Sequence, residues 1–92
     1  ILDVDIHDPE KYKGYMEKAK PLVDKYGGKY HVRGGPFEVI DGSWQPTRLV
    51  VIEYPDMASA KAMYLSEEYA PLKAIRESCS TGHTVIVDGY KV

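Results

Sequence analysis

The sequence has little of several features that mark common classes of protein. Its 92 residues include one cysteine, Cys79, which excludes an intrachain disulfide framework and a cysteine-rich zinc site. No apolar run approaches the roughly 20 residues that a membrane-spanning helix needs. The 12 basic residues are outnumbered by 14 acidic ones, so the chain lacks the positive field that attracts nucleic acid. We therefore expect neither nucleic acid nor membrane as a partner, and a reducing cytoplasm as the location.

Common catalytic and cofactor motifs are also missing. Gly27-Gly28 and Gly34-Gly35 lack the spacing and the following lysine of a phosphate-binding loop, and no Gly-x-Ser-x-Gly elbow occurs. The 3 histidines show no metal-ligand spacing. Cys79 falls near a predicted helix C-terminus, where the helix dipole disfavours a thiolate. We therefore expect no metal and no organic cofactor.

The composition is that of a small folded protein. Hydrophobic residues make up 43% of the chain and charged residues 28%, which argues against extended disorder. The length favours a single domain over residues 1–92, because half of it would not hold a core. Whether other residues precede Ile1 stays open.

Alternation and helical spacing predict the elements of the first half. Apolar and polar residues alternate over residues 2–7, which predicts a strand with one apolar face. Asp8-Pro9 predicts a helix start, and apolar residues recur at helical spacing up to Gly27-Gly28. A second strand is expected over residues 29–33. The glycine pair that follows, Gly34-Gly35, suggests a bulge or bend before the strand resumes over residues 37–40.

The second half begins with the most apolar segment of the chain. Residues 49–54 are rich in β-branched side chains on both faces, as in a central strand. Asp56 caps a second helix, which residues 66–69 interrupt before it continues from Ala70. A last strand is expected over residues 83–88.

This order of elements predicts a ferredoxin-like α+β fold. Two strand–helix–strand units give βαββαβ and a four-stranded antiparallel sheet, with the helices on one face. The other face stays open, although residues 49–52 place apolar side chains on both faces. A homodimer joined through the open sheet faces would cover them.

Four segments, in order along nearly the whole chain, resemble a known family. They are Asp8-Pro9-Glu10-x-Tyr12-x-x-Tyr15, Tyr26-Gly27-Gly28-Lys29-Tyr30-x-x-Arg33-Gly34-Gly35-Pro36, Val50-Val51-Ile52-Glu53-Tyr54-Pro55 and Ala62-x-Tyr64-x-Ser66-x-Glu68-Tyr69. The chain resembles the family of domain of unknown function 1330. The resemblance implies the dimeric α/β-barrel superfamily, in which two ferredoxin-like protomers pair their sheets. That superfamily includes cofactor-free monooxygenases, isomerases, haem-binding members and ligand-sensing modules.

One candidate site lies on the open face of the sheet. If Val4 and its alternating neighbours face the helices, Asp3 faces the other way and can lie beside Glu53. His31 and Arg33 would extend the same face. One interpretation is an ion-pair network that sets the register of a dimer. The other is a pocket in which a carboxylate acts as a base beside an arginine that holds an anionic substrate.

The second candidate site is the cleft between sheet and helices. Phenol side chains are concentrated in this short chain, and each offers an apolar ring with a polar tip. They are Tyr12, Tyr15, Tyr30, Tyr54, Tyr64 and Tyr69. Core packing explains Tyr12 and Tyr15 more simply. Tyr69, between two helical pieces, and Trp44, in a loop, are stronger binding candidates.

Two functions remain open. One is a cofactor-independent small-molecule enzyme, isomerase-like or monooxygenase-like. The alternative is a non-catalytic small-molecule binding or sensing module. The candidate catalytic residues are Glu53 and His31. The candidate substrate-binding residues are Arg33, Tyr30, Trp44, Tyr64 and Tyr69.

Overall fold

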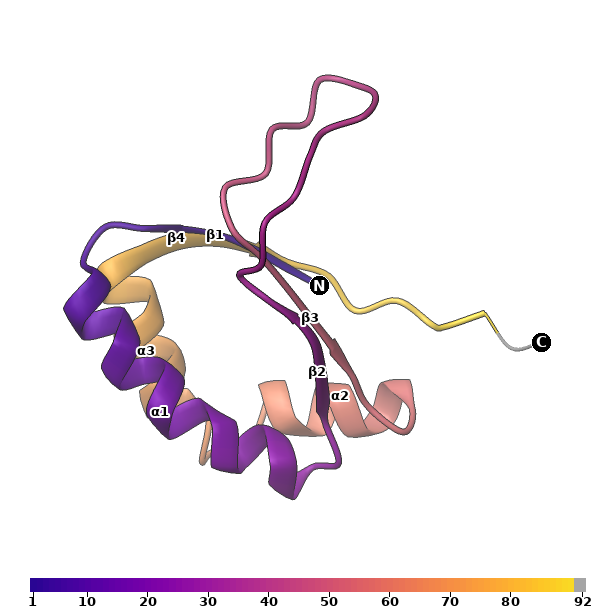
Figure 1. Cartoon of the computed structure of the whole chain (residues 1–92). Coiled ribbons are helices and arrows are strands. Elements are labelled where there is room, and N and C mark those ends of the chain that lie inside the picture. Colours follow the sequence, from indigo (N-terminus) through magenta and orange to yellow (C-terminus); the bar gives the residue numbers. More distant parts are fainter. Residues whose placement is uncertain (91–92) are drawn as a thin grey trace.

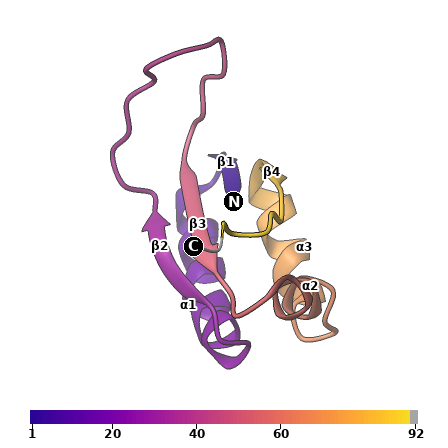
Figure 2. The same cartoon turned by 90° about the vertical axis from the view of Figure 1, so that its right-hand side faces the viewer.

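The computed structural model describes residues 1–90 and contains four strands and three helices. In chain order the elements are β1 (Leu2–Ile6), α1 (Pro9–Lys25), β2 (Lys29–Arg33), β3 (Leu49–Glu53), α2 (Met57–Tyr64), α3 (Ala70–Cys79) and β4 (Ser80–Thr84). The strand order across the sheet is β2-β3-β1-β4, and all neighbours are antiparallel (Figure 2). The ferredoxin-like fold is thereby confirmed, as is the break between α2 and α3.

Side-chain caps start the two helices that follow strands. The Asp8 carboxylate accepts a hydrogen bond from the Lys11 amide at the start of α1, and Pro9 needs no partner there. Asp56 accepts from the Ser59 amide at 2.7 Å and starts α2 in the same way. The caps fix where each helix leaves the sheet.

The hydrophobic core lies between the sheet and the helices. All three helices lie on one side of the sheet (Figure 1). Val4 of β1 is completely buried, and Val50 of β3 is 6% exposed. The alternation predicted for β1 is therefore confirmed. In the part of the chain that the structure describes, no helix is long and apolar enough to span a membrane.

Two predicted strand boundaries are wrong. Residues 37–40 form no strand but belong to an exposed loop, residues 34–48, which projects away from the helices (Figure 1). The last strand spans Ser80–Thr84 rather than residues 83–88, and it starts early because α3 runs directly into it. Val85 follows β4 and exchanges two backbone hydrogen bonds with Ile1, which end the pairing with the N-terminal segment.

A β-bulge in β2 also corrects the predicted placement of Arg33. The register shifts between Tyr30 and Val32, before the glycine pair at which the sequence suggested a bulge. As a result Val32 lies opposite Val51, and Arg33 lies opposite the core residue Val50. One extra residue reverses which face each later side chain occupies. Arg33 therefore lies on the helix side of the sheet rather than on the open face.

The open face carries both apolar and charged side chains. Leu49 of β3 is half-buried and lies opposite Asp3 of β1. Val51 and Val32 form another pair on this face and are also half-buried. None of the three helices covers them.

Candidate functional site

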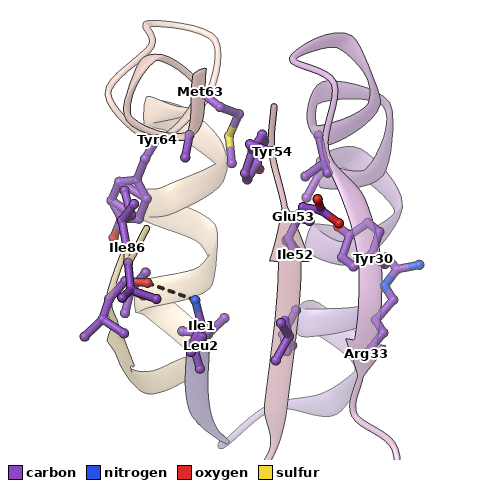
Figure 3. Close-up of a pocket in the computed structure, with 18 of the residues that line it drawn as sticks. Ile1, Leu2, Tyr30, Arg33, Ile52, Glu53, Tyr54, Met63, Tyr64 and Ile86 are labelled. Carbon is purple, nitrogen blue, oxygen red and sulfur yellow. Dashed lines mark hydrogen bonds between the residues drawn. The ribbon is translucent and has the colours of Figure 1, made fainter. Parts of the chain in front are cut away.

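A cavity of about 470 Å³ lies between the sheet and the helices. Its apolar wall includes Leu2 of β1, Ile52 of β3 and Met63 of α2 (Figure 3). Val50 of β3 also lines it. The segment that follows β4, residues 85–90, lines the other side, where Figure 3 shows Ile86 beside Tyr64. The expected cleft is therefore present, and the six tyrosines that the sequence assigned to it all line it.

Three hydroxyls and one guanidinium form a polar network in this cavity. The hydroxyls of Tyr15 and Tyr69 are 2.8 Å apart and buried. Arg76 donates from Nη2 to the hydroxyl of Tyr64 at 3.0 Å and from Nη1 to that of Tyr69 at 3.4 Å. Arg76 is only 8% exposed, so the network joins α1 and α3 to the end of α2 away from bulk water.

The turn between α2 and α3 positions Tyr69. The Ser66 hydroxyl donates to the Met63 carbonyl at 2.8 Å and accepts from the Tyr69 amide at 3.1 Å. This is the local bonding by which serine competes with a helix and favours a turn. The interruption of the helix thus carries the Tyr69 ring into the cavity wall, where it is 3% exposed.

Tyr54 comes directly after β3 and depends on a glycine for its place. A β-carbon at Gly28 would lie only 2.9 Å from Cε1 of Tyr54, so glycine is what permits the ring to approach the chain there. Figure 3 shows Tyr54 near Met63 at one end of the cavity. The Tyr54 hydroxyl is buried and has no hydrogen-bond partner within residues 1–90. It is an unused polar group in an apolar wall.

Burial raises the pKa of three tyrosines of the cavity, Tyr15, Tyr54 and Tyr69. Burial raises the pKa of the Tyr15 phenol, and the hydrogen-bonded Tyr69 raises it further. Burial also raises the pKa of Tyr69, against the opposing effects of Tyr15 and Arg76. Burial raises the pKa of Tyr54 as well. Each phenol therefore keeps its proton and can donate a hydrogen bond.

Arg76 remains a cation despite its burial. Burial by itself lowers the pKa of its guanidinium, but the hydrogen bond to Tyr64 and the nearby oxygens of Tyr69 and Tyr15 together raise it above the ordinary value. A guanidinium can only donate hydrogen bonds. The Tyr64 and Tyr69 oxygens must therefore act as its acceptors.

Counting protons in the network leaves two of them without an acceptor. The Tyr15–Tyr69 bond uses one hydroxyl proton of that pair, whichever residue is the donor. The other proton of the pair and the proton of Tyr64 have no acceptor among the described residues, because Arg76 accepts nothing. The network can thus donate two hydrogen bonds to a molecule in the cavity.

Two further arginines line the cavity near α1. The Arg33 guanidinium lies 4.6 Å from the centre of the Tyr30 ring and donates to the Met16 carbonyl at 3.1 Å. Figure 3 shows the Arg33 and Tyr30 side chains next to each other. Arg48 lies 5.4 Å from the Tyr12 ring, and its Nη1 is buried without a partner among residues 1–90. The structure therefore brings Arg33, Tyr30, Tyr64 and Tyr69, four of the predicted binding residues, to one cavity.

The two candidate catalytic residues meet on the other face of the sheet. His31 Nε2 lies 2.8 Å from Glu53 Oε1, and both side chains are substantially exposed. Glu53 borders the cavity, whereas His31 is not among the residues 1–90 that line it. Glu53 thus borders the cavity while its carboxylate is hydrogen-bonded to His31.

Trp44 lies outside the cavity as well. Its indole nitrogen donates to Oδ2 of Asp3 at 3.1 Å, and the Thr47 amide donates to Oδ1 at 2.9 Å. These bonds tie the loop of residues 34–48 to the open face, although the Trp44 side chain remains largely exposed. Trp44 and the tyrosines therefore belong to different surfaces.

Sequence reasoning did not select Arg48 and Arg76 for the site. Arg76 has a detectable signal, because it follows Leu72 by four residues and precedes Cys79 by three, on the inward face of α3. Arg48 follows a loop and has no comparable pattern. Over residues 1–90, no three His, Cys, Asp or Glu side chains come close enough together to hold a metal ion.

Comparison with known proteins places the chain in a family but gives no activity. The family model described as Domain of unknown function (DUF1330) matches residues 1–90. No curated protein matches the chain significantly.

Proposed function

Since the chain belongs to the family of Domain of unknown function (DUF1330), whose description names no activity, we propose a function from the cavity itself. The protein binds a small organic molecule between its sheet and its helices. The molecule has an apolar body and at least one oxygen that accepts hydrogen bonds. Of the two functions expected from the sequence, this is the non-catalytic binding or sensing module.

The observation that carries this proposal is the set of unused polar groups in an apolar cavity. Tyr64 and the Tyr15–Tyr69 pair offer two protons, and the Tyr54 hydroxyl has no partner within residues 1–90. A buried polar group without a partner costs about 1–3 kcal/mol. A ligand oxygen that accepts these bonds would recover that cost.

The size and lining of the cavity support the same proposal. Its volume of about 470 Å³ falls within the range of small-molecule sites, about 300–1,000 Å³. Aliphatic side chains and tyrosine rings form most of its wall, and six charged residues in the described part of the chain line it as well. Such a wall suits an aromatic or extended apolar compound.

A cofactor-independent enzyme, isomerase-like or monooxygenase-like, is the second candidate. The observation that favours it is the pair of hydroxyl donors held by the Arg76 cation, because aligned donors stabilise an oxygen that gains negative charge in a reaction. Glu53, bordering the cavity and paired with His31, is the proposed base. If it acts so, Glu53→Gln abolishes turnover and leaves affinity intact.

We also propose that two copies pair through their open sheet faces. Leu49, Val51 and Val32 supply the apolar area on this face, and none of the helices covers it. Cys79 is buried and unpaired, which suits the proposed cytoplasmic location.

Titration calorimetry with a matched pair of compounds tests the binding proposal. Cinnamamide carries a carbonyl oxygen, and propenylbenzene has nearly the same apolar body without it. We expect cinnamamide to bind at least about tenfold more tightly, since it alone accepts the unused protons. Equal affinities, or no saturable binding of either compound, would contradict the proposal.

A further inference from the structure

All three arginines of the chain line the same cavity. They are Arg33, Arg48 and Arg76. In the described part of the chain, every ion pair involves a lysine or a histidine, and none involves an arginine. Three arginines thus line the cavity, and none of them is paired with a carboxylate within residues 1–90.

Arg76 is the most buried of the three arginines. It is 8% exposed, and its side chain donates to the neutral hydroxyls of Tyr64 and Tyr69. Taking a charge out of water is costly unless an opposite charge compensates it. The two hydroxyls satisfy hydrogen bonds of the guanidinium, but they bring no negative charge.

Three acidic residues line the cavity: Glu53, Asp56 and Asp88. Glu53 lies 2.8 Å from His31 on the open face, and Asp56 accepts the Ser59 amide at the start of α2. None of the three forms an ion pair with an arginine. Within residues 1–90, no carboxylate is therefore paired with the Arg76 guanidinium.

We propose that the ligand of this cavity is an organic anion whose carboxylate lies against the Tyr64 and Tyr69 hydroxyls, in front of Arg76. The inference rests on the proposed binding function and narrows it to a class of ligand. The carboxylate accepts the two unused protons of the network, and its charge compensates the buried guanidinium. Charge-assisted bonds of this kind are stronger than bonds between neutral groups.

The same geometry disfavours a cationic group in front of Arg76. Such a group would meet the Arg76 guanidinium and two hydroxyl donors, and no carboxylate within residues 1–90 is paired with that guanidinium. Like charges in a site of low dielectric repel each other strongly. The apolar wall then selects anions with an aromatic or extended hydrocarbon body.

Calorimetry with cinnamate and cinnamamide separates this inference from the binding function. The two probes have the same apolar body and one carbonyl oxygen in common, and only cinnamate carries a charge. We expect cinnamate to bind at least about tenfold more tightly than cinnamamide, with an affinity that falls as salt increases. Equal affinities would contradict an anionic ligand but not the binding function. If neither probe binds, both the anionic ligand and the binding function are contradicted.

A variant that removes the charge of Arg76 tests where the carboxylate of the ligand binds. In Arg76→Met the preference for cinnamate over cinnamamide should fall to about threefold or less. Lys61→Met changes the net charge equally on an exposed residue of α2 outside the cavity lining, and should keep the preference. Because Arg76 is buried, Tyr64→Phe provides a second test, and it too should lower the preference. A preference unchanged in folded Tyr64→Phe would contradict this location.

Discussion

Nη2 of Arg76 donates to the hydroxyl of Tyr64 at 3.0 Å, within a wall of the cavity. The bond joins the middle of α3 to the last residue of α2 across the turn that separates them. It also fixes the role of Tyr64, whose oxygen must accept because a guanidinium cannot. A single contact thus joins two helices and leaves the hydroxyl proton of Tyr64 free to be donated.

Tyr64→Phe should destabilise the protein. The substitution keeps the ring but removes the acceptor of Arg76, so a buried guanidinium nitrogen loses its partner. We expect the free energy of unfolding to fall by about 1–3 kcal/mol in urea denaturation. Tyr90→Phe serves as the control, since Tyr90 is 90% exposed and should change nothing. Equal stability of wild type and Tyr64→Phe would contradict the assigned bond.

Tyr54→Phe should have the opposite effect on stability. The Tyr54 hydroxyl is buried without a partner among residues 1–90, so its removal relieves a desolvation cost. We expect the ligand-free protein to gain about 1 kcal/mol and its affinity for cinnamamide to weaken. Thermal denaturation with and without the compound measures both. A marked loss of stability would show that the hydroxyl is already satisfied in the free protein.

The fluorescence of Trp44 should report the ionisation of Asp3. The Thr47 amide lowers the pKa of Asp3 below its ordinary value of 3.8, and the indole bond of Trp44 contributes, against an opposing effect of burial. Because this pKa is lowered in the folded state, the stabilisation is complete above pH 3.8 and is lost as pH falls through the folded value. Trp44 emission should therefore change with a midpoint below pH 3.8.

Asp3→Asn provides the control for this titration. The variant removes the ionising group, so the acid transition of Trp44 emission should vanish while the protein remains folded by circular dichroism. Trp44 is the chain's single tryptophan, which makes the signal unambiguous. A transition that persists unchanged in Asp3→Asn would assign it to another group.

Leu49→Lys should separate the proposed homodimer. A lysine on the open face brings a charge into the proposed interface, while it can pair with Asp3 directly opposite and leave the protomer folded. We expect wild type to sediment as a dimer at micromolar concentration and the variant as a monomer. Leu65→Lys, at an end of α2 where Leu65 is 78% exposed, should remain dimeric. Wild-type protein that sediments as a folded monomer at this concentration would contradict the proposed homodimer.

The alternation of β1 was predictable, but the placement of Arg33 was not. Leu2, Val4 and Ile6 alternate with polar residues, and an unbroken strand keeps that parity. In β2 the extra residue between Tyr30 and Val32 reverses which face of the sheet the later side chains occupy. Pairing with β3 determines where this extra residue lies. Local sequence carries no mark of such a shift. The glycines that suggested a bulge lie beyond the end of the strand.

The sequence predicts which tyrosines line the cavity, but it does not predict the hydrogen bonds among them. The sequence places Tyr12 and Tyr15 one helical turn apart, and it identifies Tyr69 in a helix break. The contact of Tyr15 with Tyr69 joins residues 54 positions apart, which only the packing of α1 against the turn before α3 creates. Arg76 was overlooked because a charged residue on an apolar helix face is ordinarily assigned to solvent.

Methionine methyl groups give the most direct test of a ligand cavity between sheet and helices. Met16, Met57 and Met63 are the chain's 3 methionines, and all of them line the cavity. Nuclear magnetic resonance of isotope-labelled methyl groups, recorded during titration with cinnamate, should show saturable shifts that are largest for Met63, beside Tyr54 and Tyr64. The indole signal of Trp44 should stay unchanged. Shifts of Trp44 with unmoved methionine methyls would contradict the account.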